Sequence, residues 1–122
     1  RYLYNCYLAP ISRYAVAGAI WYQGESNASV DEANIYMDML KAMILGWRRY
    51  FKNDNMRFIV IQLADHLDRA GYAWEKIQSE QLRAQDEISL VKTVICRDVC
   101  DNIDIHPREK DVLSQRIVAL LK

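Results

Sequence analysis

Hydrophobic and polar positions along the chain fall into short apolar runs separated by longer amphipathic stretches. The runs at 16–22, 58–63 and 91–96 are rich in β-branched or aromatic residues and too short for helices, which predicts three buried strands. The expected order is helix, strand, helix, strand, helix, strand, helix. This alternation indicates an α/β fold with three layers, α/β/α, and a mostly parallel sheet.

Three amphipathic stretches predict the helices that follow the strands. The first begins at Ser29, because Glu32 three residues later completes a capping box. Its expected apolar stripe consists of Tyr36, Leu40, Met43, Trp47 and Tyr50, and the chain turns polar at Arg48, Arg49 and Lys52. After a loop at 64–72, the stripe of the next helix consists of Trp74, Ile77, Gln81, Ala84 and Ile88. Pro107 is expected to open the last helix, which carries Leu113, Ile117 and Leu120 on one face.

Composition narrows the class of protein. The 122 residues carry 16 Lys and Arg against 16 Asp and Glu, with 52% hydrophobic residues, as in one globular domain. The absence of a basic run argues against nucleic-acid binding, and a mean hydropathy of -0.20 argues against a membrane span. Cys6, Cys96 and Cys100 are an odd number without metal-ligand spacing. We expect reduced thiols, with a disulfide as the less favoured alternative, and no metal site.

Polar clusters follow two of the three predicted strands, at 23–27 and 98–106. Ligands of open parallel sheets bind beyond the carboxyl ends of the strands. In the second cluster Asp104 precedes His106 by two residues. A carboxylate that accepts from one imidazole nitrogen fixes the tautomer and leaves the other nitrogen free to take a proton. Taken alone, the pattern is more often a helix-start cap beside an exposed histidine.

Several segments together resemble the sialate O-acetylesterases, carbohydrate esterases with an SGNH (GDSL-type) hydrolase fold of flavodoxin-like topology. The most specific are Trp-Tyr-Gln-Gly-Glu-Ser-Asn at 21–27 and Asp-Ile-His-Pro at 104–107. Leu-Tyr-Asn at 3–5, Ala-Pro at 9–10 and Gln-Leu-Ala at 62–64 also match, so the resemblance runs over nearly the whole chain.

The resemblance implies a serine esterase that removes acetyl groups from sialic acid or related glycans without a metal or cofactor. It implies that His106 is the general base and that Asp104 orients it. Relatives of the GDSL type space the pair by three residues, a position that Ile103 occupies here, so Asp101 is kept as the alternative orienting carboxylate. His66, after the second strand, could reach the same rim, but a solvent-exposed loop histidine is the favoured interpretation.

The loop at 23–27 has an implied role of its own. Gln23 and the backbone of Gly24 are candidates to donate hydrogen bonds to the tetrahedral oxyanion, and Glu25 to orient the loop or touch the sugar. The alternative for Gln23 and Glu25 is a hydrogen-bonded loop scaffold without a chemical role.

No segment matches the family's Gly-Gln-Ser-Asn type motif, which carries the nucleophilic serine at the end of the first strand, upstream of Leu-Tyr-Asn. We therefore expect residues 1–122 to form the carboxyl-terminal part of a catalytic domain that lacks this strand and the nucleophile. The first strand of a doubly wound sheet is an interior one, so its absence would expose a sheet edge and an apolar face. The missing segment or another chain would then be needed to cover the sheet.

Ser26 is a less favoured substitute for the nucleophile. Gly24-Glu25-Ser26 approximates a nucleophile elbow, and the chain order Ser, Asp, His suits an α/β-hydrolase. Two features oppose this role: the following helix is expected to begin only at 29–31, and the Asp and His share one loop.

Two other functions compete with the esterase. Cys6 and Cys100 stand where the family pattern has Gly, and with the missing serine they favour a degenerate, noncatalytic carbohydrate-binding or structural module. A nucleotide-binding domain of flavodoxin type ranks last, because no Gly-rich phosphate loop is present.

Overall fold

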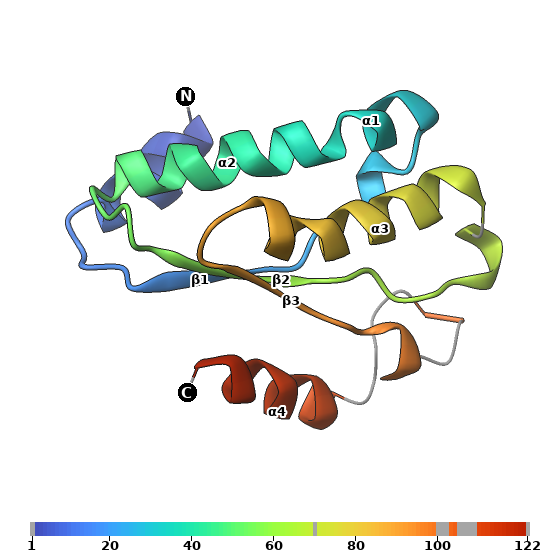
Figure 1. Cartoon of the computed structure of the whole chain (residues 1–122). Helices are drawn as coiled ribbons and strands as arrows, with labels where there is room; N and C mark the ends of the chain where they lie inside the picture. The colour runs from blue at the N-terminus through green and yellow to red at the C-terminus, as the bar shows by residue number, and fades with distance from the viewer. Residues whose placement is uncertain (1, 70, 100–102, 105–109, 122) are drawn as a thin grey trace.

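A parallel sheet of three strands forms the centre of the computed structural model (Figure 1). The strands, in the order in which they lie side by side, are β1 (Gly18–Trp21), β2 (Arg57–Ile61) and β3 (Val91–Val94). The structure describes residues 2–69, 71–99, 103–104 and 110–121. Because all three strands run in the same direction, their carboxyl ends lie at one edge of the sheet.

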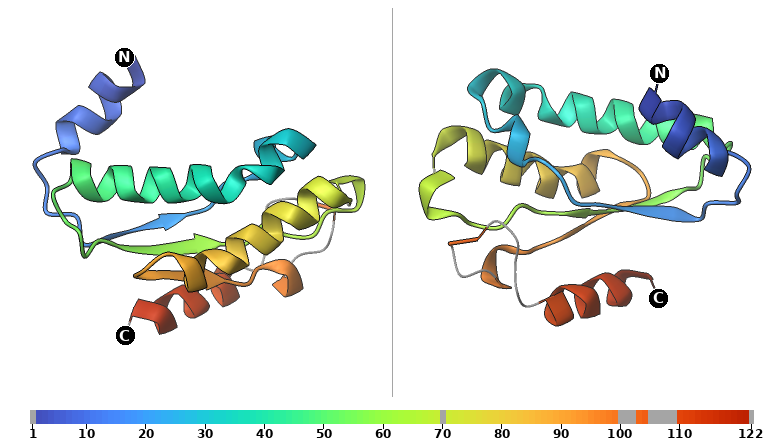
Figure 2. Two further views of the ribbon diagram at one scale, coloured as in Figure 1. Left: turned by 45° about the horizontal axis from the view of Figure 1, so that its top comes forward. Right: turned by 180° about the vertical axis from the view of Figure 1, so that it is seen from behind.

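Helices cover both faces of this sheet. On one face lie α1 (Val30–Asn34), α2 (Tyr36–Tyr50) and α3 (Tyr72–Glu87), and on the other lies α4 (Lys110–Leu121), as Figure 1 and Figure 2 show. Short helical turns are η1 (Tyr4–Leu8), η2 (Ala9–Ile11), η3 (Glu25–Asn27), η4 (Leu67–Arg69) and η5 (Arg97–Val99). The predicted three-layer α/β fold with a parallel sheet is confirmed.

The side chains of β2 build the core on both faces of the sheet. Successive residues of a strand point to opposite faces. Accordingly, Phe58 and Val60 are buried in the cluster beneath α2 and α3, whereas Ile59 and Ile61 are buried in the cluster that contains Leu113 of α4. A strand buried on both faces has a continuous apolar run rather than an alternating one, which is why this strand was recognisable in the sequence.

The prediction that the first strand is buried was wrong. The residues of β1 alternate between exposed and half-buried, and Ile20 is 55% exposed. Within the described part of the chain β1 pairs with β2 alone and is therefore an edge strand. An apolar run indicates a strand, but it does not say how many neighbours that strand has.

The predicted single helix after Ser29 is divided in two at Ile35. The capping box is present as predicted, because the Ser29 Oγ accepts from the backbone N–H of Glu32 at 3.3 Å. The N–H of Ile35 then bonds to the carbonyl of Glu32, three residues back, and this tighter turn ends α1. The new start at Tyr36 lets the tyrosine hydroxyl donate to the carbonyl of Gln23 at 2.9 Å.

The buried face of α2 is also rotated from the predicted stripe. Tyr36, Leu40 and Ile44 are buried as its centre, whereas Met43, Trp47 and Tyr50 are only half-buried. Arg48, expected at the polar end, is 5% exposed. Its guanidinium donates to the carbonyls of Met56 at 3.1 Å and Ser89 at 2.6 Å, so it joins the loops that precede β2 and β3.

Smaller predictions have mixed outcomes. In α4, Leu113 is buried and Ile117 half-buried, but Leu120 is 39% exposed. Cys6 and Cys96 carry reduced thiols, while Pro107 and Cys100 lie outside the described residues. In the part of the chain that the structure describes, no helix has the length and apolar character needed to cross a membrane. The same residues contain no cluster of three or more metal-ligating side chains.

Replacing Arg48 by Met should lower the free energy of unfolding by about 2–3 kcal/mol, because two backbone carbonyls lose their donor while the apolar stem is kept. Urea unfolding followed by tryptophan fluorescence would measure the change. Arg49→Met is the matched control: Arg49 is exposed, and the cost there should stay within about 0.5 kcal/mol. Equal midpoints for the two variants would contradict the role assigned to Arg48.

Candidate functional site

A cleft of about 850 Å³ lies where the loops after all three strands meet. The loop after β1 contributes Ala28, the segment after β2 contributes residues between His66 and Trp74, and the segment after β3 contributes Ile103 and Asp104. Its size is within the range of small-molecule sites, about 300–1,000 Å³. Its position at the carboxyl ends of parallel strands is the one that ligands occupy in open α/β sheets.

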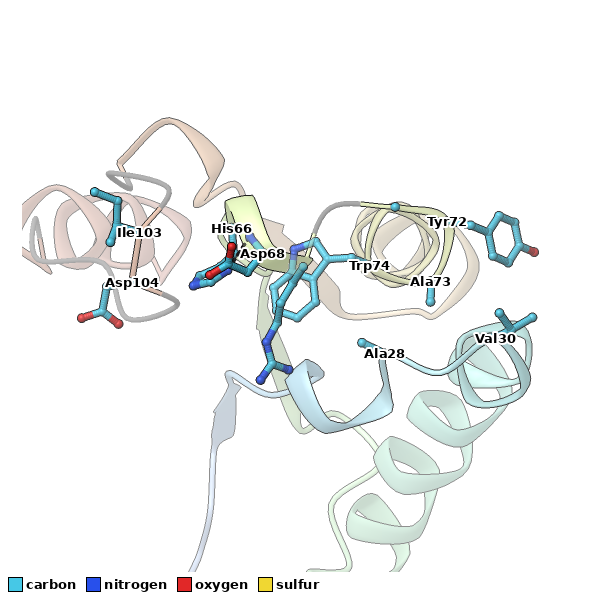
Figure 3. Close-up of a pocket in the computed structure, with 11 residues that line it drawn as sticks. Ala28, Val30, His66, Asp68, Tyr72, Ala73, Trp74, Ile103 and Asp104 are labelled. Carbon is cyan, nitrogen blue, oxygen red and sulfur yellow. Dashed lines mark hydrogen bonds between the residues drawn. The ribbon is translucent and has the colours of Figure 1, made fainter.

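Figure 3 shows how the side chains are arranged along the cleft. Asp104 and Ile103 lie on one side, Trp74 and Tyr72 on the other, and His66 lies between them. Asp104 is half-buried. His106, its predicted partner, and the alternative carboxylate Asp101 lie outside the described residues, so the catalytic pair stays a prediction.

His66 lies closer to the site than the favoured interpretation of the sequence placed it. It is half-buried in the cleft wall, and its Nδ1 accepts from the backbone N–H of Asp68 at 3.2 Å. This hydrogen bond sets the orientation of the imidazole ring. A histidine of defined orientation therefore faces the same cavity as Asp104.

The loop after β1 is fastened by the buried side chain of Gln81. The Gln81 Oε1 accepts from the backbone N–H of Leu63 at 2.8 Å, and its Nε2 donates to the carbonyl of Gln23 at 2.9 Å and to the Tyr36 hydroxyl at 3.1 Å. One amide on α3 thus holds together the ends of β1 and β2 and the first turn of α2. Burial raises the pKa of the Tyr36 phenol, so the hydroxyl stays protonated and remains a donor to Gln23.

Position 24 requires glycine, because of both its backbone conformation and the small space around it. Its φ of 150° is one that other residues rarely adopt. A Cβ added there would stand 3.1 Å from both the Gln81 Nε2 and the Ile77 Cγ2, and 3.2 Å from the Leu63 Cδ1. The close approach of α3 therefore fixes the path of the chain between Gln23 and Glu25.

The predicted oxyanion loop is held by hydrogen bonds, but its side chains do not line the large cleft. The Gln23 Nε2 donates to the Asn27 Oδ1 at 2.6 Å, and Gln23 lines a separate hollow of about 180 Å³ beside Trp21 and Tyr36. The Glu25 carbonyl accepts from the Arg69 Nη1 at 3.4 Å. The roles of Gln23, Gly24 and Glu25 at the oxyanion stay predictions.

Ser26 has the surroundings of a loop residue. It is exposed within η3, and α1 begins only at Val30. A nucleophile elbow requires the helix to follow the serine directly. The local structure thus agrees with the objection raised from the sequence.

Ion pairs hold the segments that lead from β3 toward Asp104. Arg116 of α4 donates to both carboxylate oxygens of Asp98, at 2.7 and 2.6 Å. This guanidinium lowers the pKa of Asp98 to about 2. On the other side of η5, the Arg97 Nε donates to Asp65 at 2.7 Å, which ties η5 to the loop after β2.

Arg69 and Trp74 line the cleft although the sequence pattern marked neither as a site residue, and Trp74 was expected only in the apolar stripe of its helix. Trp74 is buried, its indole Nε1 donates to the carbonyl of Ala64 at 3.0 Å, and the Arg69 guanidinium lies 5.8 Å from the centre of its ring. Both residues follow the carboxyl end of β2. Ligands of parallel sheets bind beyond the carboxyl ends of the strands, and this rule singled out the loops after β1 and β3. Applied to the segment after β2, it would have indicated these two residues as well.

Comparisons with known proteins agree on one family. The sequence model of a family described as "Carbohydrate esterase, sialic acid-specific acetylesterase" matches residues 3–117. The chain is 28% identical to the sialate O-acetylesterase of Rattus norvegicus over 94% of its length, and 24% identical to that of Homo sapiens. A crystal structure of a carbohydrate acetylesterase from Xanthomonas citri superposes with a TM-score of 0.84 and 28% identity over 93% of this chain.

The chain corresponds to only a part of each relative. It spans 24% of the rat protein, 25% of the human protein and 27% of the Xanthomonas citri chain. The similarity therefore covers most of these 122 residues and about a quarter of each relative.

Replacing Gln81 by Leu should loosen the loop at 23–27, because the Leu63 N–H loses its acceptor and the Gln23 carbonyl loses one of two donors. We expect amide hydrogen exchange at 23–27 to quicken by at least about tenfold, and stability to fall by about 2–3 kcal/mol. Hydrogen exchange with mass spectrometry would measure the first, and urea unfolding the second. The exposed Gln115→Leu on α4 is the control; unchanged exchange at 23–27 in Gln81→Leu would refute the fastening role.

Proposed function

The chain belongs to the sialic acid-specific carbohydrate esterases, and from this membership we propose that it takes part in hydrolysing acetyl esters on sugar hydroxyls. The observation that carries the proposal is the cleft built from the loops after all three strands, with Asp104 in its wall. Asp104 is the residue that the family resemblance assigns to orienting the base. The substrate is a small acetylated sugar, for which a cleft of about 850 Å³ has room.

The proposed reaction is acyl transfer through a serine. His106, oriented by Asp104, takes the serine proton as the serine oxygen attacks the acetyl carbonyl. The oxyanion of the tetrahedral intermediate accepts hydrogen bonds from the Gly24 backbone and Gln23. His106 then protonates the departing sugar oxygen. In the second half, His106 deprotonates a water that attacks the acetyl-serine, and acetate leaves as the serine regains its proton. The scheme uses no metal or cofactor.

The proposed nucleophile comes from sequence outside these 122 residues. Ser26 is exposed in η3 and has no place at a strand-to-helix elbow. The edge of β1 supports the same view, because β1 pairs on one side within the described residues and Ile20 is 55% exposed. A further strand that carries the serine, contributed by the same protein or by another chain, would pair with this edge and cover it.

A noncatalytic carbohydrate-binding module is the second candidate. It is favoured by the bond between the side chains of Gln23 and Asn27, which engages one of the two N–H groups with which the Gln23 amide could donate to an oxyanion. In that case the cleft would bind an acetylated sugar without cleaving it.

Activity of the complete gene product on 4-nitrophenyl acetate tests the esterase proposal. His106→Ala should lower kcat by about 10³-fold, since it removes the base for both half-reactions. Asp104→Asn should lower kcat by at least about 10²-fold through the wrong tautomer. Ser26→Ala is the matched control and should change kcat by less than about twofold.

Each contrary result has a definite meaning. A complete protein that hydrolyses no acetyl ester would favour the noncatalytic module. Loss of activity in Ser26→Ala would move the nucleophile into this chain. Esterase activity in residues 1–122 alone, as a cooperatively melting monomer, would overturn the proposal that the serine and a covering strand come from elsewhere.

A further inference from the structure

Arg69 is the one side chain of fixed positive charge in the described wall of the large cleft. Two contacts hold it there. Its guanidinium carbon lies 5.8 Å from the ring centre of Trp74, and its Nη1 donates to the Glu25 carbonyl at 3.4 Å. Trp74 is in turn fixed by its own bond to Ala64. The position of the charge is therefore set by two of the loops that form the cleft.

Arg69 differs from three other arginines of the described residues in the partners it has. Arg83, Arg97 and Arg116 each form an ion pair with a carboxylate. Among the described residues, Arg69 forms no ion pair, and a single N–H is engaged by a carbonyl. A guanidinium has five N–H donors in a planar fork that matches a carboxylate. Arg69 therefore retains the donors needed to bind an anion inside the cleft.

We propose that Arg69 is the residue that selects acidic sugars, by binding the carboxylate of an O-acetylated sialic acid with two parallel hydrogen bonds. This inference rests on the proposed function of the same cleft. A neutral acetylated sugar offers no carboxylate to this fork, so Arg69 would discriminate between the two substrate classes.

Because the cleft contains acidic groups, an anionic substrate needs a cation there to bind. Asp68 and Asp104 both line the same cavity, and the carboxylate of Asp68 repels an anionic substrate. An acidic sugar is then accepted only if its carboxylate is paired with a cation. Arg69 supplies that charge over the ring of Trp74, and Figure 3 shows Trp74 on the other side of the cleft from Asp104.

The test compares an O-acetylated sialic acid with its carboxyl methyl ester, which has the same acetyl group but no negative charge. Arg69→Gln and Arg69→Lys are made in the complete gene product. Arg57→Gln is the control, because it removes one exposed arginine at the amino end of β2, opposite the cleft. Two quantities are measured for each variant: kcat/KM for both esters, and the Kd for the deacetylated acid and its methyl ester by calorimetry.

The unaltered protein should prefer the acid over the methyl ester by about tenfold or more in kcat/KM and Kd, the strength of a charge-assisted pair. Arg69→Gln should remove that preference. The kcat/KM for the acid should fall mainly because its KM rises. Arg69→Lys should retain part of it, because the charge remains without the fork. Arg57→Gln should leave the preference intact.

Binding and hydrolysis separate this inference from the esterase proposal. If Arg69→Gln weakens both compounds equally, or the unaltered protein does not distinguish them in Kd, the role of Arg69 is refuted whatever the activity. If no ester is hydrolysed but the acid still binds through Arg69, the esterase proposal fails and the carboxylate site stands.

Discussion

The buried amide of Gln81 is the interaction on which the arrangement of the site depends. It reaches from α3 to the backbone after β1 and to the backbone after β2, and it also contacts the Tyr36 hydroxyl of α2. In a low-dielectric interior an unpaired backbone group costs more than a paired one gains, so the network is stable only when complete. The loop containing Gly24 consequently has one permitted path, close against α3.

The parallel sheet explains why three distant segments meet in one cleft. Each strand runs in the same direction, so each following loop emerges at the same edge. The sheet does not fix the exact path of each loop, and side chains do this instead. Gln81 of α3 holds the loop after β1, and the ion pairs Arg97–Asp65 and Arg116–Asp98 hold the turn after β3. Exposed ion pairs of this kind contribute little stability, but they hold η5, the turn after β3, to the loop after β2 and to α4.

The sequence predicted the features that depend on local pattern and missed those that depend on distant partners. Continuous apolar runs and a capping box at Ser29 were sufficient to find the strands and the first helix start. The burial of Arg48 could not be read in the same way, because it depends on two carbonyls from loops far along the chain. The exposure of β1 likewise depends on which strands pair with it, a property of the whole sheet. The family resemblance, carried by 21–27 and 104–107, identified the family correctly, while Arg69 lay outside its motifs.

The proposed hydrolysis and the proposed binding of an acidic sugar require opposite charges in one cavity. Orienting a catalytic imidazole requires a carboxylate, whereas accepting an acidic sugar requires a cation. If these charges stood side by side they would pair with each other and neither would be available. Figure 3 shows Asp104 and Trp74 on different sides of the cleft, and Arg69 stacks on Trp74. The aromatic ring and the Glu25 carbonyl hold the guanidinium without neutralising it. The carboxylate assigned to the imidazole and the cation assigned to the acidic sugar therefore come from different loops of the cleft, Asp104 from the segment after β3 and Arg69 from the segment after β2.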